Sequence, residues 1–281
     1  MTESITNEQI DALVRQALDE DIGSGDITTR NILDENSLWT AEVLAKETLT
    51  LCGMEIFRRV FSLLDASCTF AGSSHQDGEE VSTGDVIVKV LGKGVALLEG
   101  ERTALNILQK LSGIATLTRK FVERAGPVTV LDTRKTTAGL RIFEKYAVKC
   151  GGGKNHRFGL YDEVMIKDNH IKAAGGITEA VGRIRKKLGQ ERTIEVETTN
   201  LREVEEALSA GVDTIMLDNM ATDMIRQAVV LVARKAKIEV SGSISLERLD
   251  ELAGTGTDYV SVGALTHSAP AVDISMNFSE K

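Results

Sequence analysis

From residue 127 onward, short runs of β-branched residues alternate with stretches that have the spacing of amphipathic helices. Strands that alternate with helices form a parallel sheet, which is either closed into a barrel or open and doubly wound. This part of the chain is therefore predicted to be an α/β domain. Strands are expected at residues 128–132, 163–167, 193–197, 214–218, 237–241 and 259–263, and helices at 178–188, 201–210, 223–236 and 246–253.

The positions of the reactive side chains favour a barrel over an open sheet. Barrel enzymes take catalytic residues from the C-terminal ends of several strands. An open sheet instead binds its ligand at one switch point, usually with a glycine fingerprint after its first strand, and the chain has neither a GxGxxG nor a GxxxxGK(S/T) motif. We therefore predict a barrel, because polar or glycine residues end all the expected strands: Asp132, Lys167, Glu197, Asp218, Ser241 and Gly263.

The first 125 residues have a different pattern. Helical spacing is expected at residues 5–21 and again at 99–125, in one or two helices. Between them, short apolar segments at 39–53 and 85–92 are separated by glycine and polar turns, which predicts a small β-rich region. Residues 73–85 are expected to be exposed loops, and the helical stretch at 99–125 is the expected connection between two domains.

Charge is distributed unevenly along the chain. The formal net charge is −9, but residues 132–172 contain nine Lys/Arg and five Asp/Glu, a local net charge of +4. A cationic cleft in an acidic protein attracts small anions without promoting general adhesion to nucleic acids. Aromatic residues make up only 4% of the chain, which offers little surface for stacking on bases. We therefore expect small anionic substrates and no nucleic acid as partners.

Cysteine usage and the N-terminal sequence indicate the compartment. Three cysteines are an odd number and show no metal-binding spacing, so neither a disulfide framework nor a zinc site is expected. The N-terminus lacks a basic and apolar signal segment, and no stretch approaches about eighteen uncharged apolar residues. A cytoplasmic protein that does not enter a membrane is therefore expected.

Two segments rich in Lys and Arg lie near the first two expected strands: residues 132–141 begin at the end of the first strand, and residues 151–170 include the second. In residues 132–141, Arg134 could hold a carboxylate or phosphate bidentately beside the point charge of Lys135, although salt bridges in an ordinary loop are the alternative. In residues 151–170, three consecutive glycines allow the backbone to approach a ligand closely. A lone histidine is more often structural, but the cationic context favours ligand binding by His156, Arg157 and Lys167.

Carboxylates are expected to complete the site. Glu197 and Asp218 end successive strands, so both should face the same mouth of the barrel, where they could hold Mg²⁺, sugar hydroxyls, or both. Capping of the following helices is the alternative. Glu195 is expected to point into the barrel on the same side as Glu197, and a buried pair of acids is costly unless cations compensate it.

Two late segments, residues 239–245 and 261–268, place small residues where a strand ends and a helix begins. Free backbone N–H groups and the helix dipole can bind an anion there, and barrels frequently bind phosphate at the loops after their last two strands. A tight turn would explain one such loop, but two in succession favour a phosphate site.

Together these motifs resemble the quinolinate phosphoribosyltransferase family, also called nicotinate-nucleotide pyrophosphorylases. The resemblance implies that quinolinate and phosphoribosyl pyrophosphate react, with Mg²⁺, to give nicotinate mononucleotide, pyrophosphate and CO₂ in de novo NAD synthesis. The segments that carry it follow one another over nearly the whole chain: 19–29, 101–116, 132–141, 145–170, 195–197, 216–220, 239–242 and 261–275.

The resemblance also implies an architecture. The expected fold is an incomplete (β/α) barrel of six to seven strands at residues 113–268. An N-terminal α/β open-sandwich domain at 1–112 is joined by the C-terminal segment 269–281. The expected assembly is a homodimer, or a hexamer, in which the N-terminal part of one subunit closes the active site of the other.

Roles for individual residues follow from the same resemblance. The two carboxylates of quinolinate would be held by Arg134, His156, Arg157 and Lys167, with Arg102 of the partner subunit. The phosphoribosyl pyrophosphate and its metal would be served by Lys135, Glu197 and Asp218, which together with Lys167 form the expected catalytic group. The phosphate site would be lined by Ser241, Gly242, Ser243, Gly263 and Ala264.

Two positions depart from the usual family pattern. Ala138 stands where proline is customary, so the loop that carries Arg134 and Lys135 is expected to be less preorganised. Ser243 stands where glycine is customary, and its Cβ is tolerable at a negative φ but harmful if the position needs a positive one.

Three other readings stay open from the sequence. One is a paralogue of different specificity, such as the type associated with molybdate transport. The second is a phosphate-binding barrel lyase or isomerase that uses Lys167 as a Schiff-base or proton-transfer residue. The third is an anion-binding regulator without catalysis, if Ala138 and Ser243 mark lost activity.

Overall fold

A computed structural model describes residues 5–72 and 75–280 of the chain, apart from the side chain of Glu280. The chain divides into two compact units. Unit 1 comprises Met1–Arg119, Ile142–Gly152 and Ala269–Lys281, and unit 2 comprises Lys120–Arg141 and Gly153–Ser268. The domain boundaries expected from the sequence stay a prediction, and residues 73–74 of the expected loop 73–85 lie outside the described part.

Unit 1 is built on an antiparallel sheet, as the β-rich pattern predicts. The strand order is β12-β1-β5-β3, and a separate antiparallel pair joins β2 to β4. Alternate residues of β1, including Ala41, Val43 and Ala45, are buried, so one face of the strand packs on the core. The bounds are β1 Leu38–Ala45, β2 Leu49–Thr50, β3 Thr69–Ala71, β4 Glu80–Val81, β5 Val86–Lys93 and β12 Ile274–Glu280.

The helices of unit 1 include three that the sequence analysis did not predict. Helix α1 begins after a capping box between Thr6 and Gln9 and buries the face that the spacing indicates. Helix α4 is one continuous helix, which extends past Arg119 into the residues assigned to unit 2. The bounds are α1 Asn7–Ile22, α2 Thr29–Ile32, α3 Met54–Leu64, α4 Gly94–Ala125 and α5 Arg141–Cys150, of which α2, α3 and α5 were not predicted.

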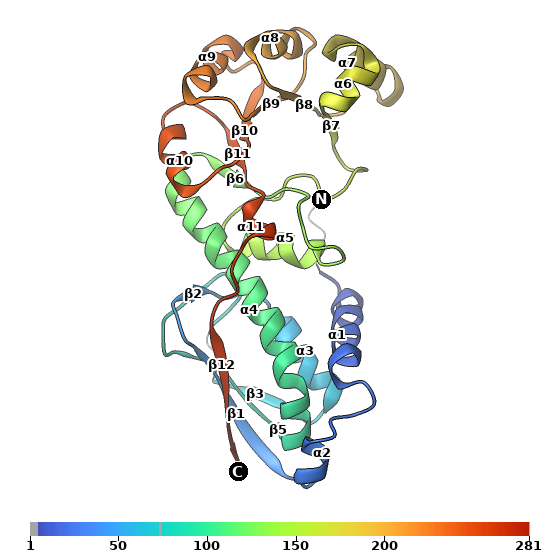
Figure 1. Cartoon of the computed structure of the whole chain (residues 1–281), viewed down its shortest axis with the longest axis vertical. Coiled ribbons are helices and arrows are strands. Elements are labelled where there is room, and N and C mark those ends of the chain that lie inside the picture. Colours follow the sequence, from blue (N-terminus) through green and yellow to red (C-terminus); the bar gives the residue numbers. More distant parts are fainter. Residues whose placement is uncertain (1–4, 73–74, 281) are drawn as a thin grey trace. The chain divides into compact units, whose positions relative to one another are not determined.

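The C-terminal segment belongs to unit 1, where β12 runs beside β1 (Figure 1). The backbone of this segment approaches α4 so closely that a Cβ at Gly113 would lie 2.0 Å from the carbonyl oxygen of Pro270. Gln109 fixes the register, because its side chain donates to the carbonyl of Ile274 and its carbonyl accepts from Val272. Glycine at 113 is therefore a packing requirement.

Unit 2 contains the six parallel strands that the β-branched runs predict. The order is β6-β11-β10-β9-β8-β7, and every neighbouring pair is parallel. In this order the last strand, β11, pairs with the first, β6, as it would in a closed barrel. The bounds are β6 Thr129–Leu131, β7 Val164–Ile166, β8 Ile194–Thr198, β9 Thr214–Asp218, β10 Lys237–Ser241 and β11 Tyr259–Ser261.

The barrel is open between β6 and β7, which are the outer strands of the sheet. At this opening Leu131 of β6 forms a parallel bridge with Lys154, which follows the three glycines. Lys154 thus lies against the outer edge of β6. The predicted fold class, an incomplete (β/α) barrel with an N-terminal α/β domain, is confirmed.

Helices follow one another around the outside of the strands of unit 2 (Figure 1). The helix expected at 223–236 ends early, because Ala233 and Arg234 have φ values of +48° and +62°, outside the helical region. Within the described residues, no helix is long and apolar enough to cross a membrane. The bounds are α6 Asp168–Ala174, α7 Ile177–Leu188, α8 Leu201–Ser209, α9 Thr222–Val232, α10 Leu246–Leu252 and α11 Ala264–His267.

Candidate active site

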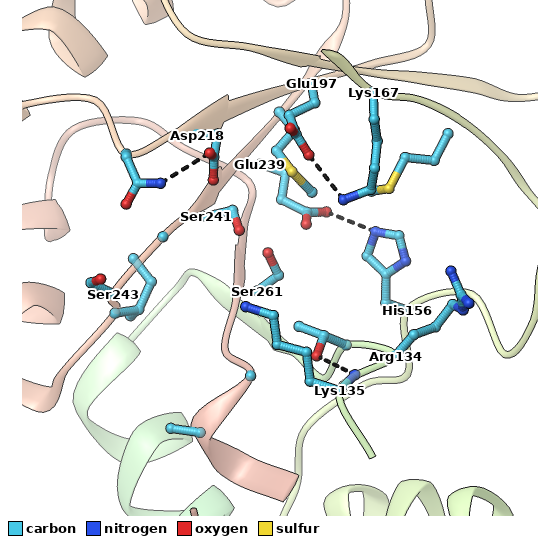
Figure 2. A pocket seen from close by; sticks show the side chains of 18 of the residues that line it. Arg134, Lys135, His156, Lys167, Glu197, Asp218, Glu239, Ser241, Ser243 and Ser261 are labelled. Atoms are coloured by element: carbon cyan, nitrogen blue, oxygen red, sulfur yellow. Dashed lines mark hydrogen bonds and ion pairs between the residues drawn. The ribbon is translucent and has the colours of Figure 1, made fainter. Parts of the chain in front are cut away.

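A cavity of about 730 Å³ lies at the C-terminal ends of the strands of unit 2 (Figure 2). This is the face at which barrels carry their active sites. Residues from several strand ends and from the loop after the glycines meet there. The sequence-predicted residues that line it are Arg134, Lys135, His156, Arg157, Lys167, Glu197, Asp218, Ser241, Gly242, Ser243, Gly263 and Ala264.

Arg102 is the one predicted site residue that does not line this cavity. It lies on α4 in the part of that helix assigned to unit 1. Its side chain is 67% exposed, and its ion pair with the adjacent Glu101 is a long contact of 3.5 Å. Its expected role, in the active site of a partner subunit, stays a prediction.

Arg134 and Arg157 give the cavity its anion-binding character. Among the described residues neither guanidinium forms an ion pair with a carboxylate, and Nε of Arg134 is buried without a hydrogen-bond partner. Burial and the charge of Arg134 lower the pKa of Arg157. Two neighbouring guanidinium groups, neither of them in an ion pair with a carboxylate of the described residues, suit an anionic ligand.

The loop that carries Arg134 and Lys135 is held from both sides despite Ala138. The carbonyl of Lys135 accepts from Oγ1 of Thr266 at 2.8 Å. Arg141 donates to Oγ1 of Thr136 at 3.0 Å and to the carbonyl of Phe158, also at 3.0 Å. These contacts supply preorganisation that a proline would otherwise give.

Lys167 and Glu197 form the ion pair of the site. Nζ of Lys167 donates to Oε2 of Glu197 at 3.0 Å, and the two side chains are 43% and 16% exposed (Figure 2). Lys167 precedes α6, and His170 accepts the backbone N–H of Lys167 through Nδ1 at 2.9 Å. His170 thus supports the end of the strand.

Asp218 and the loop after β10 form the opposite side of the cavity. Oδ2 of Asp218 accepts from the side chain of Asn219, which itself has a φ of +54°. A Cβ at Gly242 would lie 2.2 Å from Oδ1 of Asn219, so only glycine fits where the two loops touch. Ser243 follows with a φ of +48°, the left-handed conformation that glycine adopts without strain.

Gly263 allows a second close approach. A Cβ there would lie 3.0 Å from Cδ of Lys135 and 3.1 Å from Nε2 of His267. The small residue therefore lets the lysine stem pass along the loop after β11 toward the cavity. His267, which also lines the cavity, was not singled out from the sequence.

His156 stands in a buried acidic environment. Its Nε2 lies 3.0 Å from Oε2 of Glu195 and 3.5 Å from Oε2 of Glu239. Burial disfavours the imidazolium, but the hydrogen bonds to the two glutamates outweigh burial and raise the pKa of His156. The backbone N–H of Arg157 donates to Nδ1 at 2.7 Å and acts in the opposite direction, because Nδ1 can accept only while it carries no proton.

Of these two glutamates, only Glu195 was predicted from the sequence. Glu195 points inward, as predicted, and desolvation raises the pKa of its carboxyl group. Glu239 was missed, although the run KIEVS on β10 places it as TIEVE on β8 places Glu195. A glutamate flanked by two apolar residues in a buried strand was the available signal.

The carboxylates in the cavity suit Mg²⁺ better than a metal ion that is coordinated by protein side chains alone. Glu197 and Asp218 offer two partly buried carboxylates in one cavity. In the described part of the chain they do not belong to a group of three close ligand side chains; the two such groups are Cys52, Asp77 and Cys150, and His156, Glu195 and Glu239. Mg²⁺ usually takes one or two carboxylates and completes its shell with substrate phosphates and water.

Comparison with known proteins gives one consistent result. Models of the N-terminal and C-terminal domains of quinolinate phosphoribosyl transferase match residues 26–112 and 114–277. A probable nicotinate-nucleotide pyrophosphorylase (carboxylating) of Bacillus subtilis is 46% identical over 271 residues, 96% of this chain and 93% of that protein. A quinolinate phosphoribosyltransferase (decarboxylating) of Nicotiana tabacum is 41% identical over 94% of this chain and 81% of its own length.

Solved structures agree with the sequence matches. The crystal structure of NadC from Streptococcus pyogenes superposes with a TM-score of 0.95 at 44% identity and covers 99% of both chains. The nicotinate-nucleotide pyrophosphorylase of Francisella tularensis gives a TM-score of 0.94 at 40% identity, again over 99% of both chains. The resemblance read from the sequence is confirmed: the chain belongs to the quinolinate phosphoribosyltransferase family.

Proposed function

We propose that the chain joins quinolinate to phosphoribosyl pyrophosphate and releases CO₂ and pyrophosphate, which yields nicotinate mononucleotide for NAD synthesis. The enzyme class predicted from the sequence is confirmed by the names of its relatives. The observation that carries the assignment of the site is the pair Arg134 and Arg157, two cations in the cavity that form no ion pair with a carboxylate among the described residues. A dicarboxylate supplies the missing negative charges.

Quinolinate carries two carboxylates on adjacent ring carbons. We place them against Arg134 and Arg157, whose planar guanidinium groups suit bidentate contacts with carboxylates. Lys167 would supply a further positive charge, shared with Glu197. This arrangement explains why cations cluster in an otherwise acidic chain.

The phosphoribosyl pyrophosphate belongs on the other side of the cavity. Lys135 is suited to its phosphates as a point charge, and the loops at Gly242 and Gly263 allow the backbone to approach them closely. Glu197 and Asp218 would hold the ribose hydroxyls and Mg²⁺. When bound, Mg²⁺ would neutralise the charge that develops on the departing pyrophosphate.

The chemistry needs no nucleophile from the protein. Positive charge builds up at the anomeric carbon of the ribose as pyrophosphate departs, and the carboxylates of Glu197 and Asp218 stabilise it. The ring nitrogen of quinolinate attacks this carbon, and positioning of the two substrates supplies most of the rate. Nζ of Lys167 donates to Glu197, an arrangement that suits charge stabilisation and not the Schiff base of a lyase.

Loss of CO₂ follows from the new bond. When CO₂ departs, the electron pair of the broken bond stays on the ring carbon, where the positive charge of the adjacent quaternised nitrogen stabilises it, and a proton then adds to that carbon. Arg134 and Lys167 must bind this carboxylate without over-stabilising it, since only interactions stronger in the transition state accelerate the step.

The assembly is part of the proposal. We propose a homodimer in which Arg102 of the partner subunit reaches quinolinate, and a hexamer built from such dimers is the alternative. The exposure of the Arg102 side chain is consistent with a role outside its own subunit. The expected cytoplasmic location likewise stays a prediction.

The experiment is product analysis with the purified protein. Quinolinate, phosphoribosyl pyrophosphate and Mg²⁺ should give nicotinate mononucleotide, whereas nicotinate in place of quinolinate should give none, because it lacks the second carboxylate. Turnover of nicotinate at the rate of quinolinate would contradict the role given to the two arginines.

A further inference from the structure

Both ring nitrogens of His156 are engaged by the protein. Nε2 faces Glu195 at 3.0 Å and Glu239 at 3.5 Å, and Nδ1 accepts the backbone N–H of Arg157 at 2.7 Å (Figure 2 shows the contact with Glu239). The imidazole is only 9% exposed. With Nδ1 as an acceptor and the proton of Nε2 directed at the glutamates, the ring has no hydrogen bond left to offer a substrate carboxylate.

The two glutamates are fixed parts of the barrel interior. They come from β8 and β10, which flank β9 in the sheet, and their side chains are 9% and 2% exposed. The second oxygen of each, Oε1, is buried without a hydrogen-bond partner among the described residues. Burying two such acids is costly. Their joint contact with one imidazole therefore indicates that His156 has to be held in place.

The loop after the glycines needs an anchor at this point. Asp132, which is fully buried, accepts from the backbone N–H of His156 at 2.9 Å and from the side chain of Asn155 at 2.6 Å. Farther on, the carboxylate of Asp162 accepts the N–H groups of Phe158 and Gly159. Between these two clamps, the N–H of Arg157 is bonded to Nδ1 of His156.

We propose that Glu195 and Glu239 are positioning residues that hold His156 through Nε2, and that His156 in turn holds the backbone of Arg157 through Nδ1. His156 is then the anchor of the glycine-rich loop and not a ligand of the substrate, in contrast to the role that the family resemblance implies. The proposal rests on the proposed function only for the identity of the anion that Arg157 binds.

Glu195 is the sharper site for a test, because it is absent from the cavity lining and can act only through its neighbours. Glu195→Ala removes the nearer of the two acceptors of Nε2, whereas Glu195→Gln keeps a carbonyl oxygen in its place. Glu205→Ala, an exposed position on α8, is the matched control. His156→Phe keeps a ring but loses both contacts and serves if Glu195→Ala does not fold.

Backbone amide hydrogen exchange, recorded without substrate, measures how firmly His156 holds the loop. In Glu195→Ala and His156→Phe, exchange in peptides covering residues 154–159 should rise about tenfold or more, while peptides of β9 keep their protection. Glu195→Gln and Glu205→Ala should stay within about threefold of the unchanged protein. Unchanged exchange in Glu195→Ala, or an equal rise in Glu195→Gln, would overturn the proposal.

Quinolinate binding, measured by calorimetry without phosphoribosyl pyrophosphate, tests the link to Arg157. Glu195→Ala should weaken quinolinate binding about tenfold. In the Arg157→Ala background it should weaken binding by at most about a further twofold, because the two changes remove the same interaction. Fully additive effects would refute the coupling. Absence of turnover in the unchanged protein, together with the predicted rise of exchange in Glu195→Ala, would refute the proposed function alone. Normal turnover in the unchanged protein, together with unchanged exchange in Glu195→Ala, would refute the anchor alone.

Discussion

Replacing Ser243 by glycine should leave the affinity for phosphoribosyl pyrophosphate equal or higher and should slightly stabilise the protein. Ser243 has a φ of +48°, and a left-handed conformation costs a residue with a Cβ roughly 1–2 kcal/mol. Glycine avoids this cost, but its greater conformational freedom in the unfolded chain destabilises the folded protein by about 0.4–1 kcal/mol. The net gain is about 0.5–1 kcal/mol, or a rise of about 1–4 °C in melting temperature for a chain of this size.

The assay combines thermal unfolding with the KM for phosphoribosyl pyrophosphate. Ser243→Ala is the matched control, because it removes the exposed hydroxyl but keeps the Cβ and its strain. Ser243→Gly should gain stability where Ser243→Ala does not. A loss of affinity of about tenfold or more in Ser243→Gly, equivalent to about 1.4 kcal/mol, would refute the reasoning about this loop.

Three further predictions concern the ion pair, the packing of unit 1 and the metal. Lys167→Ala and Glu197→Ala should each lower kcat by about 10²–10³ with the melting curve retained, and near-normal rates in either would remove it from the site. Gly113→Ala, whose Cβ would lie 2.0 Å from the oxygen of Pro270, should cost about 1–3 kcal/mol in thermal unfolding, whereas the helical Gly182→Ala, with open space around it, should be neutral or stabilising. Chelation of Mg²⁺ should stop product formation and leave quinolinate binding intact by calorimetry; activity that persists in excess chelator would contradict the metal role.

The strands of unit 2 could be predicted from the sequence because each is a short β-branched run with a polar or glycine end. The expected runs at 214–218 and 237–241 coincide with β9 and β10. Helix α5, which was not predicted, buries Phe143, Ala147 and Val148 at helical spacing. It begins in one cation-rich segment and ends at the next, so its charged residues were interpreted as ligand-binding residues and not as one face of a helix. The end of α9 depends on the left-handed Ala233, which no residue type signals.

The residues of the site were easier to predict than their contacts. The sequence places Arg134, Arg157 and Lys167 at the strand ends and in the loop by the glycines, and the structure brings all three to one cavity. The partners of His156 come from strands about 40 and 80 residues farther along the chain. Only the fold shows that both nitrogens of this ring are already used.

The central claim is tested most directly by the release of CO₂ from quinolinate labelled in the carboxyl group next to the ring nitrogen. The account predicts one labelled CO₂ for each nicotinate mononucleotide formed, and no release when quinolinate is present but phosphoribosyl pyrophosphate or Mg²⁺ is left out. Quinolinate that binds to well-folded protein without any release of CO₂ would contradict the account and would favour a binding protein over an enzyme.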